Sequence, residues 1–159
     1  MTGRHTPDAQ WCAHATAVIV GEAGVLIRGA SGAGKSALAL ALLAAGTPAR
    51  LVSLIGDDRV QLSVVNGRLV ARAHPAIAGC IEQRGEGILR LGYEPAAVIR
   101  MTADIYPLAA GRDIPPRTPS DDELTVEIAG LMLPRLALPK ELSSEESARR
   151  VISFLCRLG

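Results

Sequence analysis

Short apolar stretches separated by glycine and charged residues make up the first third of the chain. Residues 16–20 and 25–27 are rich in valine and isoleucine and flank a glycine-containing turn, which is typical of a strand hairpin. Residues 36–45 hold only serine, alanine and leucine and precede Gly46, which predicts a helix and its end. Residues 51–55 form a second apolar run. Strand, loop, helix and strand together predict a compact, right-handed βαβ unit.

Beyond residue 59 the pattern changes to an alternation of apolar and polar positions. Residues 60–64 and 68–72 alternate around Asn66 and Gly67, a pair typical of a two-residue hairpin turn. Residues 96–102 predict a further strand. Parallel and antiparallel strands are therefore expected in one mixed sheet.

Two helices are expected toward the C-terminus. They are placed at about residues 122–133 and 144–158, and Ser143 with Glu146 forms a capping box before the second. The expected fold class is thus α/β, with the βαβ unit in a mixed, partly antiparallel sheet followed by C-terminal helices.

The domain organisation expected from the sequence is simple. A chain of 159 residues is long enough for one well-buried core, so residues 1–159 are predicted to form a single domain. Polar residues 1–12 predict a flexible arm. Residues 104–122 contain four prolines and predict a mobile loop.

Composition and charge disfavour several classes of function. The formal net charge is +1 and no basic tract is present, so a nucleic-acid partner is not expected. The longest apolar run, residues 37–45, is about half the length needed to cross a bilayer, so no membrane partner is expected either. Cys12, Cys80 and Cys156 form no C-x-x-C pair and are interpreted as reduced thiols. With no signal peptide in the polar N-terminus, we expect a cytoplasmic protein.

A glycine-rich motif lies between the second predicted strand and the first predicted helix. It reads Gly29-Ala30-Ser31-Gly32-Ala33-Gly34-Lys35-Ser36. In such a P-loop, glycines let backbone N–H groups wrap a phosphate, the lysine reaches the terminal phosphates and the serine hydroxyl reaches Mg²⁺. Because a strand precedes the motif and a helix follows it, all eight residues are predicted to bind nucleotide rather than to form a chance turn.

An acidic pair, Asp57 and Asp58, follows the strand predicted at residues 51–55. Ligands of open α/β sheets bind at the carboxyl ends of strands, so this position favours a functional role. One carboxylate would hold the metal shell and the other would orient or deprotonate an attacking hydroxyl. An Asx turn leading into a hairpin is the structural alternative.

A third motif makes the chain resemble a known family. It reads Ile81-Glu82-Gln83-Arg84-Gly85-Glu86-Gly87-Ile88. With the P-loop and the acidic pair, it is similar to the C-terminal catalytic domain of HPr kinase/phosphorylase, from His14 along most of the chain. The resemblance implies an ATP-dependent bacterial kinase that phosphorylates a serine of the phosphocarrier protein HPr, and that in many members reverses the reaction with inorganic phosphate.

The resemblance also implies roles for individual residues. Lys35 would bind phosphate, and Ser36, Glu82 and Asp58 would be ligands of Mg²⁺, which accompanies ATP as cofactor. Hexamers of related enzymes imply a homo-oligomer.

Catalytic roles are implied for His14, Asp57 and Asp58, for Arg84, and for Arg112 in the predicted loop. On residue chemistry alone, His14 is more simply a surface or strand-edge histidine. Arg84 could form an ordinary solvated pair with Glu82, and Arg112 could be a loop charge.

Three departures from the family pattern stand out. Residues 53–56 lengthen the connection to the acidic pair, which leaves open whether Asp57 or Asp58 is the base. We expect a short form without the N-terminal domain of full-length members, as in alphaproteobacterial members. The segment linked to dephosphorylation is represented by residues 116–121 alone.

Two other functions remain open on sequence grounds. A P-loop small-molecule kinase would use residues 106–122 as a lid. A nucleotide-dependent regulatory module would hydrolyse slowly, although the chain has no N-K-x-D guanine-reading motif.

Overall fold

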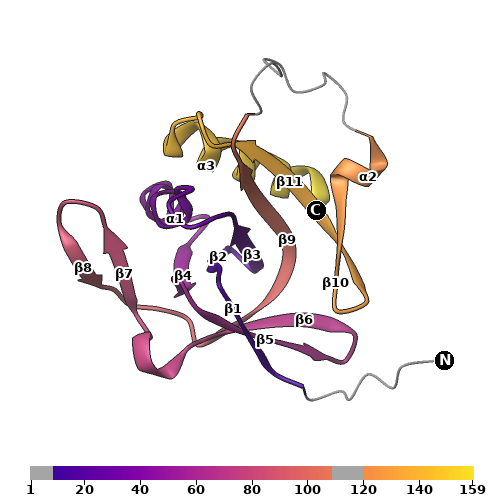
Figure 1. The fold of residues 1–159 in the computed structure, drawn as a ribbon, viewed down its shortest axis with the longest axis horizontal. Coiled ribbons are helices and arrows are strands. Elements are labelled where there is room, and N and C mark those ends of the chain that lie inside the picture. The colour runs from indigo at the N-terminus through magenta and orange to yellow at the C-terminus, as the bar shows by residue number, and fades with distance from the viewer. Residues whose placement is uncertain (1–8, 109–119) are drawn as a thin grey trace.

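A computed structural model describes residues 9–108 and 120–159. Within this part of the chain, a curled mixed sheet of nine strands forms the body of the molecule (Figure 1). Its strands are β1 (Trp11–Ala13), β2 (Thr16–Val20), β3 (Ala23–Arg28), β4 (Val52–Gly56), β5 (Val60–Val65), β6 (Arg68–Ala73), β9 (Ala96–Tyr106), β10 (Thr125–Ile128) and β11 (Leu131–Pro139). A separate hairpin holds β7 (Cys80–Gln83) and β8 (Gly87–Arg90).

Helices cover one side of this sheet. They are α1 (Lys35–Ala44) and α3 (Ser144–Leu158), with the one-turn α2 (Asp121–Leu124) and a 3₁₀ turn (Pro75–Ile77) elsewhere. In Figure 1, α1 and α3 lie above β2 and β3, and the β7–β8 hairpin stands beside α1. None of the helices in the described ranges is long and apolar enough to cross a membrane.

The long strand β9 organises the sheet. The strand order is β1-β5-β6-β9-β3-β2-β4, and β11 joins β9 as well as β10. β9 pairs in parallel with β3 and with β11, and antiparallel with β6. The predicted mixed sheet is therefore confirmed, and the carboxyl ends of β3 and β9 lie side by side.

Two apolar cores result because the central strands are buried on both faces. Along β2 and β3, Val18 and Ile27 pack with the helices, whereas the alternating residues Ala17 and Leu26 belong to the second core inside the curl. Such two-sided burial explains why these strands lack polar alternation in the sequence.

The predicted βαβ unit is present with one strand inserted. β3 and β4 both pair antiparallel with β2, so they run parallel to each other on either side of it. The residues that lengthen the connection to the acidic pair are part of β4, which runs to Gly56. The hairpin around Asn66 and Gly67 is also confirmed, both residues having positive φ (50° and 73°).

The helix predicted at residues 122–133 is wrong. α2 ends at Leu124, and the chain continues as the antiparallel β10–β11 hairpin. Ala129 and Gly130 both have positive φ (51° and 80°), the backbone of a tight hairpin turn that no helix contains. One long C-terminal helix, α3, follows, and Ser143 Oγ accepts the Glu146 N–H at 3.1 Å as the capping pattern predicts.

Parts of the two segments predicted to be mobile belong to strands. Trp11 and Cys12, assigned to the flexible arm, pair with β5. Asp104 and Tyr106, assigned to the mobile loop, belong to β9. Residues 109–119, including Arg112, lie outside the described residues.

Candidate functional site

The loop of residues 29–36 leaves β3 and enters α1 directly. Gly32 and Gly34 have φ of 78° and 103°, in the left-handed region that side chains disfavour. At Gly29 the constraint is space, because a β-carbon there would lie 3.1 Å from Ile105 O of β9. The motif glycines therefore permit a tight turn that leads straight into the helix N-terminus.

Lys35 is folded back onto this loop. Its Nζ donates to Gly29 O at 2.9 Å and to Ala30 O at 3.0 Å, and the residue is 7% exposed. No carboxylate within the described ranges pairs with it. A buried ammonium that is matched by carbonyl dipoles alone leaves positive charge available to an anion.

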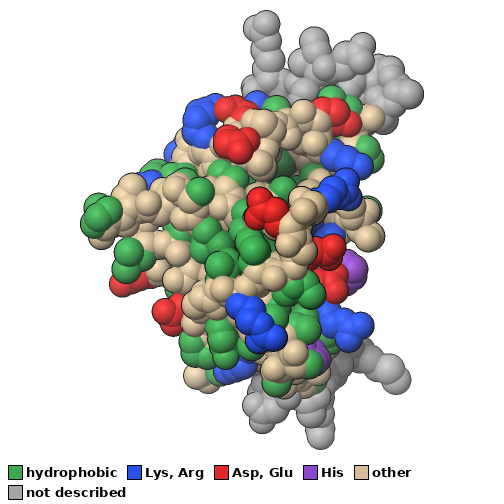
Figure 2. All heavy atoms as spheres, turned by 90° about the vertical axis from the view of Figure 1, so that its left-hand side faces the viewer, with side chains coloured by type: hydrophobic (Ala, Val, Ile, Leu, Met, Phe, Trp, Pro, Cys, Tyr) green, Lys and Arg blue, Asp and Glu red, His purple; other side chains and the backbone are tan. Residues whose placement is uncertain are grey.

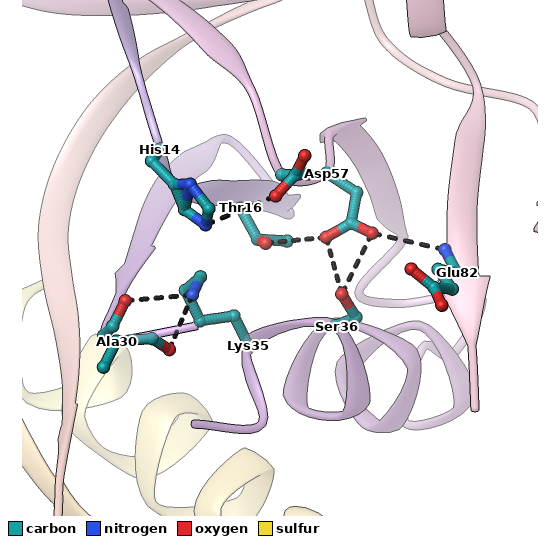
Figure 3. Close-up of polar contacts among 9 residues, drawn as sticks. His14, Thr16, Ala30, Lys35, Ser36, Asp57 and Glu82 are labelled. Atoms are coloured by element: carbon teal, nitrogen blue, oxygen red, sulfur yellow. Dashed lines mark hydrogen bonds and ion pairs between the residues drawn. The ribbon is translucent and has the colours of Figure 1, made fainter. Parts of the chain in front are cut away.

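The Asp57 carboxylate is the centre of the polar network drawn in Figure 3. Thr16 Oγ1 donates to Asp57 Oδ1 at 2.7 Å. Ser36 Oγ lies 2.8 and 2.9 Å from the two carboxylate oxygens. The Glu82 backbone N–H donates to Oδ2 at 3.3 Å. Three other segments of the chain thus converge on one carboxylate.

Asp57 is 4% exposed, and no basic side chain among the described residues pairs with it. A buried carboxylate without a cation is costly, and hydrogen bonds compensate only part of that cost. Its surroundings of hydroxyl and carboxylate oxygen suit a hard divalent cation such as Mg²⁺. The described residues hold no cluster of three or more histidine, cysteine or acidic ligands, so other oxygens would have to complete such a shell.

Asp58 occupies a different position from its neighbour. Its backbone has φ of 65°, and its carboxylate lies 3.3 Å from His14 Nε2. Both side chains are more than half exposed, at 63% and 58%. Of the metal ligands expected from the sequence, Ser36, Glu82 and Asp58, the structure places Ser36 on Asp57 and Asp58 on His14. The ligand set itself stays a prediction.

A cavity of about 890 Å³ joins these groups. Its lining includes most of the predicted site residues: His14, Ser31, Gly32, Gly34, Lys35, Ser36, Asp57, Asp58, Glu82 and Arg84. Gly29, Ala30 and Ala33 belong to the loop without lining this cavity. Arg112 lies outside the described residues, so its place relative to the cavity stays a prediction.

The β7–β8 hairpin forms one wall of the cavity. Figure 3 shows the Glu82 side chain turned toward Ser36 and Asp57. Gly85 and Gly87 in the hairpin turn have positive φ (87° and 90°), which accounts for the glycines of the third motif. Figure 2 views this side of the molecule and shows acidic, basic and hydrophobic side chains mixed on it. Ile88 of the hairpin is 71% exposed.

Thr16 is the site residue that sequence reasoning missed. It is fully buried in β2, and its partner Asp57 lies 41 positions away. The sole local signal is its position two residues after His14, since alternating residues of a strand share a face. A threonine in a valine-rich strand otherwise looks like an ordinary β-former.

Comparisons with known proteins show what the chain is similar to. The family model described as HPr Serine kinase C-terminal domain matches residues 8–94. HPr kinase/phosphorylase from Mycoplasma mycoides subsp. mycoides is 40% identical over 75 residues, which are 47% of this chain and 22% of that protein. HPr kinase/phosphorylase from Azoarcus sp. is 35% identical over 124 residues, 73% of this chain and 38% of that protein.

The match therefore spans well under half the length of these relatives. Among solved structures, the Hpr(Ser) kinase/phosphatase from Coxiella burnetii superposes with a TM-score of 0.72 at 22% identity, covering 93% of this chain and 98% of that chain. That likeness extends the shared fold beyond residue 94, through β9 and the C-terminal helix. The chain belongs to the HPr serine kinase C-terminal domain family.

Proposed function

We propose that this chain transfers the γ-phosphoryl group of ATP to a serine hydroxyl of HPr, as a cytoplasmic serine protein kinase. The observation that carries the proposal is the buried Asp57 carboxylate on Ser36, beside a glycine loop whose Lys35 has no acidic partner among the described residues. A cation site and an anion site thus adjoin, which is the electrostatic requirement of nucleotide-dependent phosphoryl transfer. Family membership supports the choice of acceptor.

The loop and α1 would bind the nucleotide phosphates. Backbone N–H groups at the helix N-terminus favour an anion. Lys35 would leave the carbonyls of Gly29 and Ala30 and pair with the terminal phosphates, exchanging neutral acceptors for charged ones.

Asp57, Ser36 and the Glu82 side chain would hold Mg²⁺. When bound, Mg²⁺ neutralises charge on the transferred phosphoryl group. The Ser36 hydroxyl donates to Asp57, so the two groups lie together. Little reorganisation is then needed on binding.

Asp58 is the better candidate for the group that accepts the proton of the acceptor serine. Asp57 already accepts from Thr16, Ser36 and the Glu82 N–H, whereas Asp58 is exposed at the mouth of the cavity. His14 lies against Asp58 and would keep its carboxylate oriented toward the acceptor.

The proposal is tested by incubating the protein with γ-labelled ATP, Mg²⁺ and purified HPr. Label on a serine of HPr supports it. Label that appears in inorganic phosphate or in small molecules, with HPr unmodified, would instead favour a regulatory module or a small-molecule kinase.

Thr16→Val should lower transfer and weaken the response to Mg²⁺, because it keeps the side-chain shape but removes a hydrogen bond to the buried Asp57. We expect a rise of about tenfold in the Mg²⁺ concentration for half-maximal rate, since a hydrogen bond to a charged group contributes roughly 1.5–3 kcal/mol. Thr16→Ser keeps the hydroxyl and should restore the wild-type response to Mg²⁺.

The chain offers a matched control for this change. Thr102 of β9 is equally buried, but its hydroxyl has no hydrogen-bond partner in the described structure. Thr102→Val should leave the Mg²⁺ titration unchanged and not reduce stability. Equal effects of the two valine variants on the titration would rule out a specific role for Thr16.

Ser36→Ala and Glu82→Gln should also shift the Mg²⁺ titration to higher concentration, because each removes an oxygen ligand or its charge. Glu86→Gln, at an exposed position in the same hairpin turn, is the control. A titration that stays at the wild-type midpoint in both variants would exclude these two residues as ligands.

A further inference from the structure

A second cavity, of about 490 Å³, lies beside the first at the carboxyl ends of β3 and β9. His14 lines both cavities, and Gly29 at the start of the glycine loop lines the second. The lining of the second cavity comes from β1, β3, β5, β9, β10 and β11. The Asp58–His14 pair therefore stands at the boundary between the two.

One wall of this second cavity is charged. Asp104 Oδ1 and Oδ2 accept from Arg28 Nε and Nη2 at 2.8 and 2.6 Å, and Oδ2 also accepts from Arg135 Nε at 2.5 Å. Burial raises the pKa of Asp104, but the two guanidinium groups outweigh this and hold its pKa below the ordinary value. The carboxyl group is therefore ionised at neutral pH, and two positive charges meet one negative charge.

The arginines retain donors for a ligand. Arg28 Nη1 and Arg135 Nη2 make no hydrogen bond within the described part of the chain, and the two side chains are 34% and 26% exposed. Arg135 Nη1 is held by Glu123 O at 3.2 Å, which fixes that guanidinium in place. Oriented donors with a surplus of positive charge suit carbonyl or carboxylate oxygens.

The rest of the lining is largely apolar and comes from elements far apart in the sequence. Trp11 of β1, Leu26 of β3, Leu62 of β5 and Ile128 of β10 contribute to it. An indole at the rim of a cavity offers a large contact area at a low cost in conformational entropy. The cavity therefore combines an apolar surface with a short row of donors.

We propose that this second cavity holds the segment of the acceptor protein that flanks the phosphorylated serine. An apolar side chain of that segment would pack on Trp11 and Ile128, and its carbonyl or carboxylate oxygens would face Arg28. The inference rests on the proposed function. With nucleotide in the larger cavity, the acceptor hydroxyl must reach the phosphoryl group from another side, and His14 marks where the two cavities meet.

The test uses the steady-state kinetics of HPr phosphorylation by the full chain. Trp11→Ala and Arg28→Met should each raise the KM for HPr by about tenfold, the usual effect of losing an aromatic anchor or a charge-assisted hydrogen bond. The KM for ATP should stay at its wild-type value, because neither side chain lines the nucleotide cavity. Met132→Ala, at a 62% exposed position of the same β10–β11 hairpin, should leave both constants unchanged.

Three outcomes would overturn the inference. If both variants keep the wild-type KM for HPr while the wild-type protein phosphorylates HPr, the acceptor binds elsewhere and the proposed function still stands. If Ile88→Ala raises that KM and the cavity variants do not, the acceptor docks on the β7–β8 hairpin instead. Absence of transfer by the wild-type protein would overturn the proposed function and this inference together. Thermal unfolding of each variant separates lost docking from lost folding.

Discussion

Asp58→Asn is expected to lower the rate of HPr phosphorylation by about 10²–10⁴-fold, the usual contribution of a positioned acid or base. Asparagine keeps the shape of the side chain but cannot take a proton. The loss corresponds to roughly 3–5 kcal/mol at the transition state. ATP affinity and the Mg²⁺ midpoint should stay near wild type, since Asp58 is exposed and faces His14 rather than Ser36.

Asp57→Asn should give a different pattern, which makes the two variants controls for each other. Removing the charge from the buried carboxylate should weaken Mg²⁺ and nucleotide binding together, because Ser36 then lacks its anionic neighbour. If Asp58→Asn instead weakens Mg²⁺ binding while Asp57→Asn does not, the roles assigned to the two residues are reversed. If Asp57 and Asp58 only form a structural turn, their asparagine variants should have a lower melting temperature but near-normal activity.

Lys35→Met has the second large expected effect. The variant should bind ATP at least tenfold more weakly, since a hydrogen bond between charged groups contributes roughly 1.5–3 kcal/mol. Transfer to HPr should be nearly abolished, because the terminal phosphates lose their point charge.

The Lys35→Met variant should lose activity without losing stability. Lys35 is a buried cation without an acidic partner in the described structure, so a methionine of similar length removes a desolvation cost. We expect an unchanged or higher melting temperature without nucleotide, measured beside ATP affinity by titration calorimetry. Wild-type ATP affinity in the folded variant would contradict the assignment of the loop.

Local patterns in the sequence were sufficient for much of the fold. The β2–β3 and β5–β6 hairpins, α1 and α3 follow from turn residues, periodicity and caps that lie within a few positions of one another. The helix expected at residues 122–133 failed for the same kind of reason. Val126, Ile128, Leu131 and Leu133 fit a hairpin once Ala129 and Gly130 form the turn, but an alanine in that turn is a weak signal.

The sequence was enough to predict the motifs of the site, but not how their side chains are arranged. Sequence placed a glycine loop and an acidic pair together, but it left open which aspartate is the base and grouped Asp58 with Ser36 as metal ligands. Which of Asp57 and Asp58 meets Ser36 is a matter of geometry. That choice depends on the positive φ of Asp58, which turns one neighbour away from the other. The Thr16–Asp57 and Arg28–Asp104 contacts join residues 41 and 76 positions apart, and no local pattern encodes them.

The central claim is that this site passes a phosphoryl group from ATP to a serine of HPr. Its most direct measurement is the intact mass of HPr after incubation with the wild-type protein, ATP and Mg²⁺, with an HPr variant whose phosphorylated serine is replaced by alanine as control. The account predicts that wild-type HPr gains the mass of one phosphoryl group, that the alanine variant gains none, and that Lys35→Met and Asp58→Asn enzymes leave HPr almost unmodified. Unmodified HPr with active, folded wild-type protein that hydrolyses ATP would contradict it.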